Sequence, residues 1–378
     1  MRTVVTSAGV FPRKVVIVIK SGIYVHVPFC AAKCRYCDFY SITWADSRLK
    51  EDYADAVMAE MDRHEAEADT LYFGGGTPPL WGVSILRVID KAYERFGLDC
   101  AEITVEANPE CTELIPELAK AGVNRISFGM QSSSAGELSA LGRGHGKDIS
   151  SAVAAAKKAG ISNISVDIML GVPYQTRASL EQTLDRVKGY GITHVSAYIL
   201  SLSENTPLYR SKDARRIPDD DTIADMYLMT ADYLSAEGFA QYEISNFAKP
   251  GYECRHNLKY WNLEPYIGFG AAAHSFIANR RYAHSKDIEA YISNPADDLY
   301  CYDQNAGQAD EFVMLQLRLA AGMDLDKAER LHGIRRDKII AAVEGLEGLA
   351  AIKNGAVCLT PRGMLVSNGI IGQLTMND

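Results

Sequence analysis

The 378-residue sequence has no hydrophobic run that approaches the roughly 18–20 residues needed to span a membrane. Residues 1–20 contain four basic and no acidic side chains, but their apolar stretch, residues 15–19, is too short for a secretory signal. We therefore expect no transmembrane segment, and an N-terminal extension over residues 1–21 that forms an extra strand or stays disordered. An organelle transit peptide is the alternative that this composition leaves open.

Cysteine is also scarce, with 8 residues in the chain, which excludes a disulfide scaffold. Most of these cysteines are scattered without the spacing of metal ligands. Such sparse, unpaired thiols are typical of a reducing compartment, so we expect a cytoplasmic protein. The scattered cysteines are Cys100, Cys111, Cys254, Cys301 and Cys358.

The sequence lacks an excess of basic residues. Its formal net charge of -9 and its pI near 5.5 argue against a nucleic acid as the main partner. Low-complexity segments are absent as well, and 47% hydrophobic with 23% charged residues is an ordinary globular composition. The length allows one large domain and a smaller one.

Three cysteines nevertheless lie within eight residues, with the C-x3-C-x2-C spacing of Cys30, Cys34 and Cys37. A loop of this size can place three thiolates around one inorganic centre but cannot easily supply a fourth. Iron–sulfur cubanes usually have four thiolate ligands, so three would leave one iron open to an external molecule. An open metal position is typical of reactive sites rather than structural ones. The alternatives are a zinc site completed by His26 or by a distant residue, and a set of buried, inert thiols.

Short β-rich runs alternate with helical patterns between residues 22 and 200, which is typical of parallel βα architecture. The predicted strands cover residues 23–27, 70–73, 102–105, 125–128, 164–168 and 194–198. The predicted helices between them cover residues 48–65, 83–96, 112–121, 148–159 and 179–190. Six units are too few for a full eight-stranded barrel, so a three-quarter barrel and an open doubly wound sheet both fit.

Polar and glycine-rich segments follow the predicted strands. The three cysteines follow the first strand, and the Gly-Gly-Gly-Thr-Pro run of residues 74–78 follows the second. Glu106 and Gln131 come after the third and fourth strands, and Asp167 lies in the fifth. Because barrel-type folds build their sites at the carboxyl ends of the strands, we expect these segments to converge around one mouth.

Each of these segments also has a simpler explanation when it is taken alone. Three glycines let a backbone approach a ligand closely, but they also make a tight turn. Glu106 and Asp167 are either solvated or helix-capping carboxylates, or partners for a ligand's ammonium group or ribose hydroxyls. Arg143 could pair with a ligand carboxylate through its planar fork or form a salt bridge, and His145 beside it has no assigned role. The interpretation of these residues as one ligand site depends on their convergence in space.

This combination of motifs resembles the radical SAM superfamily. The three-cysteine loop with Tyr36 before its last cysteine is similar to that superfamily's cluster loop, and residues 74–78 are similar to its glycine motif. More narrowly, the chain resembles the branch that contains oxygen-independent coproporphyrinogen III oxidases and HemW-type heme chaperones. The resemblance extends from about residue 22 to near the C-terminus.

The resemblance implies a cofactor set. It implies that Cys30, Cys34 and Cys37 hold a [4Fe–4S] cluster whose open iron binds the amino acid end of S-adenosylmethionine. It also implies one-electron reduction of the cluster by an electron donor, cleavage of the sulfonium and release of a 5′-deoxyadenosyl radical. In this branch some of the glycine-motif contacts serve a second S-adenosylmethionine. The positions that match S-adenosylmethionine contacts are Tyr24, Tyr36, Gly75, Gly76, Thr77, Glu106, Gln131, Arg143 and Asp167.

Two features separate the members of this branch. The oxidases carry a fourth cysteine two residues after the third, and here that position is Phe39. Residues 256–261 contain the H-N-x-x-Y-W signature of HemW-type proteins. Both features favour a heme chaperone over an oxidase.

The signature residues His256, Tyr260 and Trp261 are the candidates for heme binding. Histidine imidazole is a common axial ligand of heme iron, and the two aromatic side chains offer flat apolar surface. A core aromatic cluster around a hydrogen-bonded histidine is the alternative explanation. Cys254, two residues upstream, is a competing thiolate ligand.

The C-terminal segment favours a small helical module with a wing. Three helices are predicted over residues 311–321, 326–332 and 337–349, followed by a hairpin that turns at Asn354-Gly355. This order resembles a winged-helix module, which is often used on DNA. Residues 305–378 contain 8 basic and 9 acidic side chains, so we expect a packing module or a lid instead.

The sequence therefore predicts an α/β protein with a partial (β/α)6 TIM-like barrel of the radical SAM type and a smaller C-terminal α+β domain resembling a winged helix. The predicted boundaries are 22–245 for the barrel, 246–304 for a connecting region and 305–378 for the C-terminal domain. The predicted function is a heme chaperone that transfers heme to a recipient hemoprotein. The alternative is oxidative decarboxylation of coproporphyrinogen III to protoporphyrinogen IX in porphyrin biosynthesis.

Overall fold

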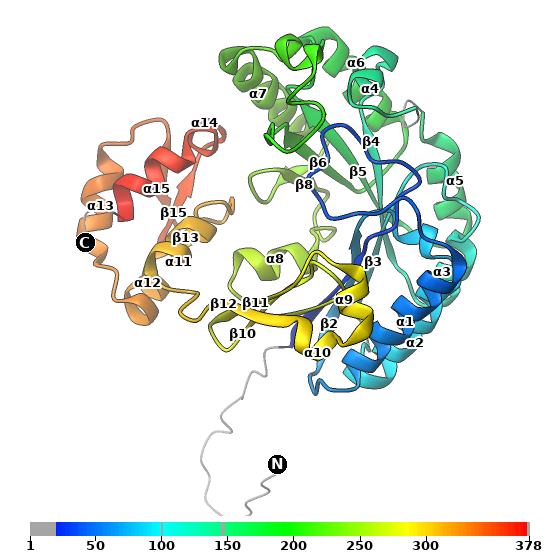
Figure 1. Ribbon diagram of the computed structural model, residues 1–378. Helices are drawn as coiled ribbons and strands as arrows, with labels where there is room; N and C mark the ends of the chain where they lie inside the picture. Colours follow the sequence, from blue (N-terminus) through cyan, green and yellow to red (C-terminus); the bar gives the residue numbers. More distant parts are fainter. Residues whose placement is uncertain (1–19, 100, 145–147, 376–378) are drawn as a thin grey trace, which may run out of the picture.

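The computed structural model of the protein describes residues 20–99, 101–144 and 148–375 (Figure 1). Residues 1–19 of the predicted extension, Cys100 and His145 lie outside these ranges, and Ser21 already belongs to the first strand. Within the described ranges, no helix is both long and apolar enough to cross a membrane.

Six parallel strands form the centre of the fold, in the sequence order that the alternating pattern predicts. Each pairs in parallel with the next, so all six carboxyl ends point the same way. The strands are β1 (Ser21–Val27), β2 (Ala68–Gly75), β3 (Glu102–Ala107), β4 (Arg125–Gln131), β5 (Asn163–Leu170) and β6 (His194–Ile199). The predicted partial barrel is confirmed.

Helices cover the outer face of these strands in an arc (Figure 1). Four match predicted helices closely, whereas α3 is half as long as expected and the short α4 and long α7 were not predicted. These helices are α1 (Ser47–Met61), α2 (Ser84–Phe96), α3 (Ile115–Lys120), α4 (Ala135–Ala140), α5 (Ser150–Lys158), α6 (Arg177–Gly189) and α7 (Asp220–Ala236).

The two faces of the parallel strands differ in chemistry. Residues such as Ile23, Val25 and Leu71 are fully buried in the main hydrophobic core under the helices. The alternate residues are polar and bond to one another inside the barrel: Ser127 donates to Asp167 (3.0 Å), and Ser165 pairs with His194 (2.8 Å). Parallel strands buried on both faces normally read as continuous apolar runs, so this alternation indicates a polar interior.

Six further strands widen the sheet beyond the predicted six. β9 pairs parallel with the free edge of β1, and three antiparallel strands follow it outward; two short strands extend the opposite edge from β6. The strands are β7 (Ala240–Gln241), β8 (Asn246–Ala248), β9 (Tyr266–Phe269), β10 (His274–Ile277), β11 (Arg280–His284) and β12 (Leu299–Asp303). β1 thus lies inside a twelve-stranded sheet.

Short helices fill the spaces around this sheet. α8 (Arg255–Trp261) lies at the amino ends of the barrel strands, where the backbone N–H groups of Arg255 and His256 donate to the Glu102 carboxylate at the start of β3. The other short helices are the 3₁₀ segments η1 (Pro78–Trp81) and η2 (Lys212–Arg216), with α9 (Ile288–Ser293) and α10 (Pro295–Asp298).

The C-terminal residues form a helical module with the predicted hairpin, whereas a third strand and the last two helices were not predicted. The hairpin turns at Asn354 and Gly355, which both have positive φ (51° and 80°), as a type I′ turn requires. Buried side chains such as Phe312 and Leu317 join the core of the barrel without a break. The elements are α11 (Ala309–Gln316), β13 (Met323–Asp324), α12 (Leu325–His332), α13 (Arg336–Glu344), β14 (Ala350–Lys353), β15 (Ala356–Leu359), α14 (Pro361–Leu365) and α15 (Ser367–Thr375).

Candidate functional site

The cysteine loop, which we define as residues 28–41, leaves the carboxyl end of β1 and is fixed at its base and at its tip. Its base closes where Cys30 N–H donates to the Ile42 carbonyl (3.0 Å) and Ile42 N–H donates to the Pro28 carbonyl (2.7 Å). At its tip, the Arg35 guanidinium donates to the Ala140 carbonyl and to Asp213. The loop is therefore held in place by residues far away in the sequence.

Two of the three thiols of this loop lie beside side-chain donors. The Thr77 hydroxyl approaches the Cys30 sulfur (3.9 Å), and the Arg143 guanidinium approaches the Cys34 sulfur (3.8 Å). Burial raises the pKa of the Cys30 and Cys37 thiols. Metal binding requires thiolates, so loading this site would displace those protons.

A cavity of about 380 Å³ opens in front of the thiols, which we call the cysteine cavity. The ends of all six parallel strands contribute to it, so the predicted convergence around one mouth is observed. It brings together the three cysteines and eight of the nine S-adenosylmethionine candidates, Tyr24 being the exception. The candidates that line it are Tyr36, Gly75, Gly76, Thr77, Glu106, Gln131, Arg143 and Asp167.

Two of the glycines sit where a side chain would collide with the protein itself. A Cβ on Gly76 would lie 2.7 Å from the Val27 carbonyl oxygen and 2.8 Å from that of Phe29. Gly75 has a φ of 105°, and a Cβ there would meet the His26 ring at 2.4 Å. The glycine run is thus both a tight turn against the cysteine loop and one wall of the cavity.

Two enclosed carboxyl groups face this cavity, one from β3 and one from β5, on either side of β4. Glu106 accepts hydrogen bonds from the Tyr72 hydroxyl (2.7 Å) and the Gly75 N–H (3.2 Å). Burial, with the charge of Asp167, raises the pKa of Glu106 to about 7. Burial also raises the pKa of Asp167. Perturbed carboxyl groups in a cleft are typical of ligand-binding and catalytic sites.

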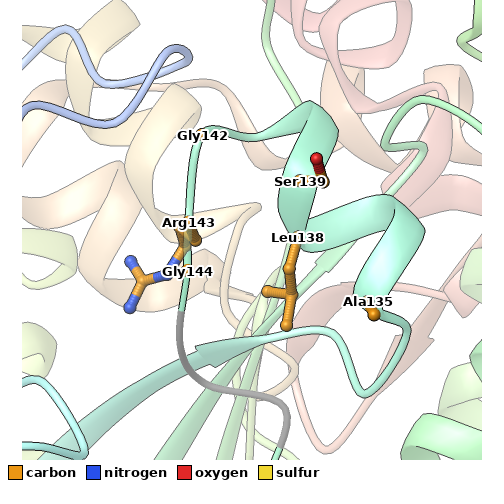
Figure 2. Close-up of a pocket in the computed structure, with 6 residues that line it drawn as sticks. All are labelled: Ala135, Leu138, Ser139, Gly142, Arg143 and Gly144. Carbon is orange, nitrogen blue, oxygen red and sulfur yellow. The ribbon is translucent and has the colours of Figure 1, made fainter.

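Arg143 follows α4 and reaches across the cavity. Figure 2 shows its guanidinium pointing away from Ala135 and Ser139 of that helix. One nitrogen donates to the Gly129 carbonyl (2.8 Å) and the Asn108 side chain (3.1 Å). The buried Nε has no hydrogen-bond partner among the described residues.

Gln131 and Asn108 carry two further signals of a built site. Gln131 has a φ of 66° at a β-bulge between β4 and β5, a strained conformation for a residue other than glycine. The Asn108 amide donates to the Thr77 hydroxyl (3.2 Å) and accepts from Arg143, so it links two of the predicted residues. Asn108 was not among the predicted site residues, although its place directly after β3 was a usable signal.

Tyr24 faces a second cavity, also of about 380 Å³, beside the first. Its hydroxyl bonds to His26 (3.1 Å), and Phe39, which is 66% exposed, lies between the two cavities and lines both. The second cavity is lined by Tyr24, His26, Asp38, Phe39, Tyr40, Tyr260, Tyr266, Ala272, His274 and Lys286.

The three heme candidates of α8 lie in different environments in the structure. His256 is 1% exposed, and both ring nitrogens are engaged, by the Thr70 hydroxyl (2.8 Å) and the Tyr260 hydroxyl (2.7 Å). Burial lowers its pKa to about 3. Tyr260 lines the second cavity, whereas the Trp261 carbonyl accepts from Gln316 in the C-terminal module. In this conformation His256 has no free nitrogen for a ligand.

The donor set of the cysteine loop fits an iron–sulfur cubane. Among the residues that the structure describes, no three His, Cys, Asp or Glu side chains are arranged to hold a single metal ion. A cubane needs no such arrangement, because each thiolate binds a different iron. Three thiols on one loop, an open cavity in front and neutralising donors behind are the features that a three-ligand cluster requires.

The chain is similar to known protein families over two segments. Residues 24–187 match the radical SAM superfamily, and residues 305–366 match the HemN C-terminal domain. The solved structure of coproporphyrinogen III oxidase (HemN) from Escherichia coli superposes with a TM-score of 0.79 at 21% identity, covering 94% of this chain and 90% of that one. The fold is that of a radical SAM protein.

Curated relatives identify the family within this class of proteins. The chain is 33% identical to heme chaperone HemW of Bacillus subtilis, covering 92% of this chain and 97% of the relative. It is 34% identical to heme chaperone HemW of Mycobacterium tuberculosis, covering 93% and 94%, and 38% identical to that of Escherichia coli, covering 67% and 69%. The chain belongs to the HemW family.

Proposed function

We propose that this protein is a heme chaperone of the cytoplasm, which binds a [4Fe–4S] cluster and S-adenosylmethionine and hands heme to a recipient hemoprotein. The observation that carries the proposal is the cysteine cavity: three thiols face a pocket lined by eight further predicted binding residues. Membership of the HemW family supports heme as the cargo.

Each predicted residue has a role that its position supports. Cys30, Cys34 and Cys37 hold the cluster, and the enclosed Glu106 and Asp167 carboxyl groups accept hydrogen bonds from a ligand's hydroxyl or ammonium groups. Arg143, which lines the same cavity, supplies a guanidinium for a ligand carboxylate. When bound, the cluster supplies one electron at the open iron, where S-adenosylmethionine would lie. The protein orients these groups and excludes water.

Phe39 supports the chaperone over the oxidase. It occupies the position of the oxidases' fourth cysteine and is 66% exposed at the boundary between the two cavities. An exposed phenylalanine offers a flat apolar surface for a porphyrin face. It cannot donate a thiol hydrogen or ligate iron.

One experiment separates the two functions. The cluster is reconstituted anaerobically; hemin is titrated while the Soret band is followed, and coproporphyrinogen III turnover is assayed with S-adenosylmethionine and a reductant. We expect a saturable Soret shift, transfer of heme to apomyoglobin as a generic acceptor, and no vinyl product. Vinyl product at enzymatic rates from the unaltered chain would identify it as an oxidase. Vinyl product only from a Phe39→Cys variant would identify the missing fourth cysteine as the difference between this chain and the oxidases.

We expect S-adenosylmethionine to bind more tightly as the pH rises from about 6 to about 8. With a pKa of about 7, the Glu106 carboxyl is roughly one-tenth ionised at the lower pH and nine-tenths at the higher. The ionised form accepts hydrogen bonds from ribose hydroxyls more strongly. Affinity should therefore increase several-fold, as measured by equilibrium dialysis of the cluster-loaded protein.

The matched control replaces an exposed carboxylate a few residues further along the sequence. Glu106→Gln should flatten the pH profile, whereas Glu113→Gln should leave it as in the unaltered chain. A Glu106→Gln profile that still rises in parallel with that of the unaltered chain would contradict this role.

A further inference from the structure

We propose that the second cavity is the heme site and that His274 supplies the iron ligand through Nε2. This inference rests on the proposed function, because it locates the cargo of the chaperone. It assigns the iron ligand to the start of β10 rather than to the His256 signature on α8.

His274 has the geometry of a metal-binding histidine. Its side chain lines the second cavity and is exposed, and Nδ1 bonds to the Tyr302 hydroxyl of β12 (3.1 Å). Metal-ligating histidines are usually oriented by a hydrogen bond at the other ring nitrogen. No hydrogen bond from the described part of the chain engages Nε2, so this nitrogen is free to bind a ligand.

The other two histidines near the cavity have both ring nitrogens engaged in hydrogen bonds. His26 is bonded at Nδ1 by the Tyr24 hydroxyl (3.1 Å) and at Nε2 by the Tyr40 carbonyl (2.9 Å). Both nitrogens of His256 are occupied as well, and its ring is buried under Tyr24 and Tyr72. Of these three imidazoles, His274 alone can bind iron without breaking a hydrogen bond to the protein.

The walls of the cavity suit a porphyrin. Tyr24, Tyr260, Tyr266 and the exposed Phe39 supply aromatic surface on more than one side. At the rim, the exposed Lys286 has no ion-pair partner among the described residues and can pair with a propionate. A volume of about 380 Å³ is within the range of small-molecule sites and leaves one porphyrin edge toward solvent.

Burial and the positive charges of Lys286 and Arg281 lower the pKa of His274. The imidazole is therefore neutral at neutral pH, which is the form that binds iron.

An adenosyl group is the competing occupant of the second cavity, because the aromatic walls would also stack on adenine. It would need no iron ligand and would gain nothing from a cation at the rim.

The test titrates hemin into the cluster-loaded protein and its variants while the Soret band is followed. His274→Ala should weaken hemin binding by at least about 10-fold, because loss of even an outer-shell partner of a metal ligand costs about 10- to 100-fold. His274→Tyr should keep binding but change the spectrum to that of a phenolate-ligated heme. Lys286→Ala should remove a preference for hemin over its uncharged dimethyl ester.

His332→Ala, on α12 of the C-terminal module, is the matched control and should bind hemin as the unaltered chain does. If the unaltered chain shows no saturable binding, the proposed function itself fails. If it binds and His274→Ala binds equally well with the same spectrum, the assignment of His274 fails alone. Weakened S-adenosylmethionine binding with unchanged hemin binding in His274→Ala would assign the cavity to the adenosyl group and overturn the proposal.

Discussion

Replacing any one of Cys30, Cys34 and Cys37 with alanine should reduce the iron and acid-labile sulfide bound after anaerobic reconstitution to roughly one-tenth or less of that in the unaltered chain. The loop carries three thiols, and the structure offers no substitute thiol in the cysteine cavity. A cluster left with two protein ligands would have two open irons and would be lost to solvent. Iron and sulfide analysis and the visible absorbance of the cluster measure this directly.

The matched control is Cys301→Ala, because Cys301 is an exposed thiol on β12, outside the cysteine loop. It should load as much iron as the unaltered chain. Addition of S-adenosylmethionine to the loaded protein should alter the electron paramagnetic resonance spectrum of the reduced cluster, because the fourth iron has no cysteine. Full iron loading in a chain lacking all three loop cysteines, or zinc in place of iron, would refute the cluster assignment.

Gly76→Ala should destabilise the cysteine loop and the site around it. The new Cβ would lie 2.7–2.8 Å from the carbonyl oxygens of Val27 and Phe29, which are backbone atoms that no rotamer change can move. Those two residues anchor the cysteine loop through hydrogen bonds from Gly76 and Thr77, both 2.8 Å long. We expect the free energy of unfolding to fall by about 1–3 kcal/mol, as for overpacked cores, and cluster loading to fall with it.

Gly189→Ala provides the comparison, since a Cβ there has no atom within 4 Å and the residue ends α6 with an ordinary backbone. This change should leave stability within about 1 kcal/mol of the unaltered chain or raise it slightly. Thermal or urea unfolding of both variants, together with their iron content, distinguishes a local clash from a general effect of replacing glycine. Equal stability and loading in the two variants would show that the loop is not wedged against Gly76.

The parallel strands and the cysteine cavity could be predicted because their signals are local. Each strand is a short β-rich run, and each site residue stands within a few positions of a strand end, so parallel pairing alone brings them together. Arg143 was also predicted, but its contact with Cys34 depends on the turn after α4, a helix too short to show a clear period.

The second cavity could not be predicted, because its residues meet only through non-local pairing. His274 lies beside Tyr24 because β9 joins the free edge of β1 and β10 folds back on β9. Strands of four or five residues carry little periodic signal. Similarly, the H-N-x-x-Y-W signature marks a family but gives no sign that α8 would bury His256 against Thr70 and Tyr260.

The uninterrupted core has a consequence for how the molecule comes apart. Phe312 and Leu317 of the C-terminal module share one buried cluster with the barrel, and Gln316 of α11 bonds to the backbone of Trp261 in α8. We expect two regions joined in this way to unfold as one cooperative unit rather than as two independent domains. Cleaving the chain ahead of Ala309 would strip apolar cover from both halves, so neither half is expected to persist alone as a folded fragment.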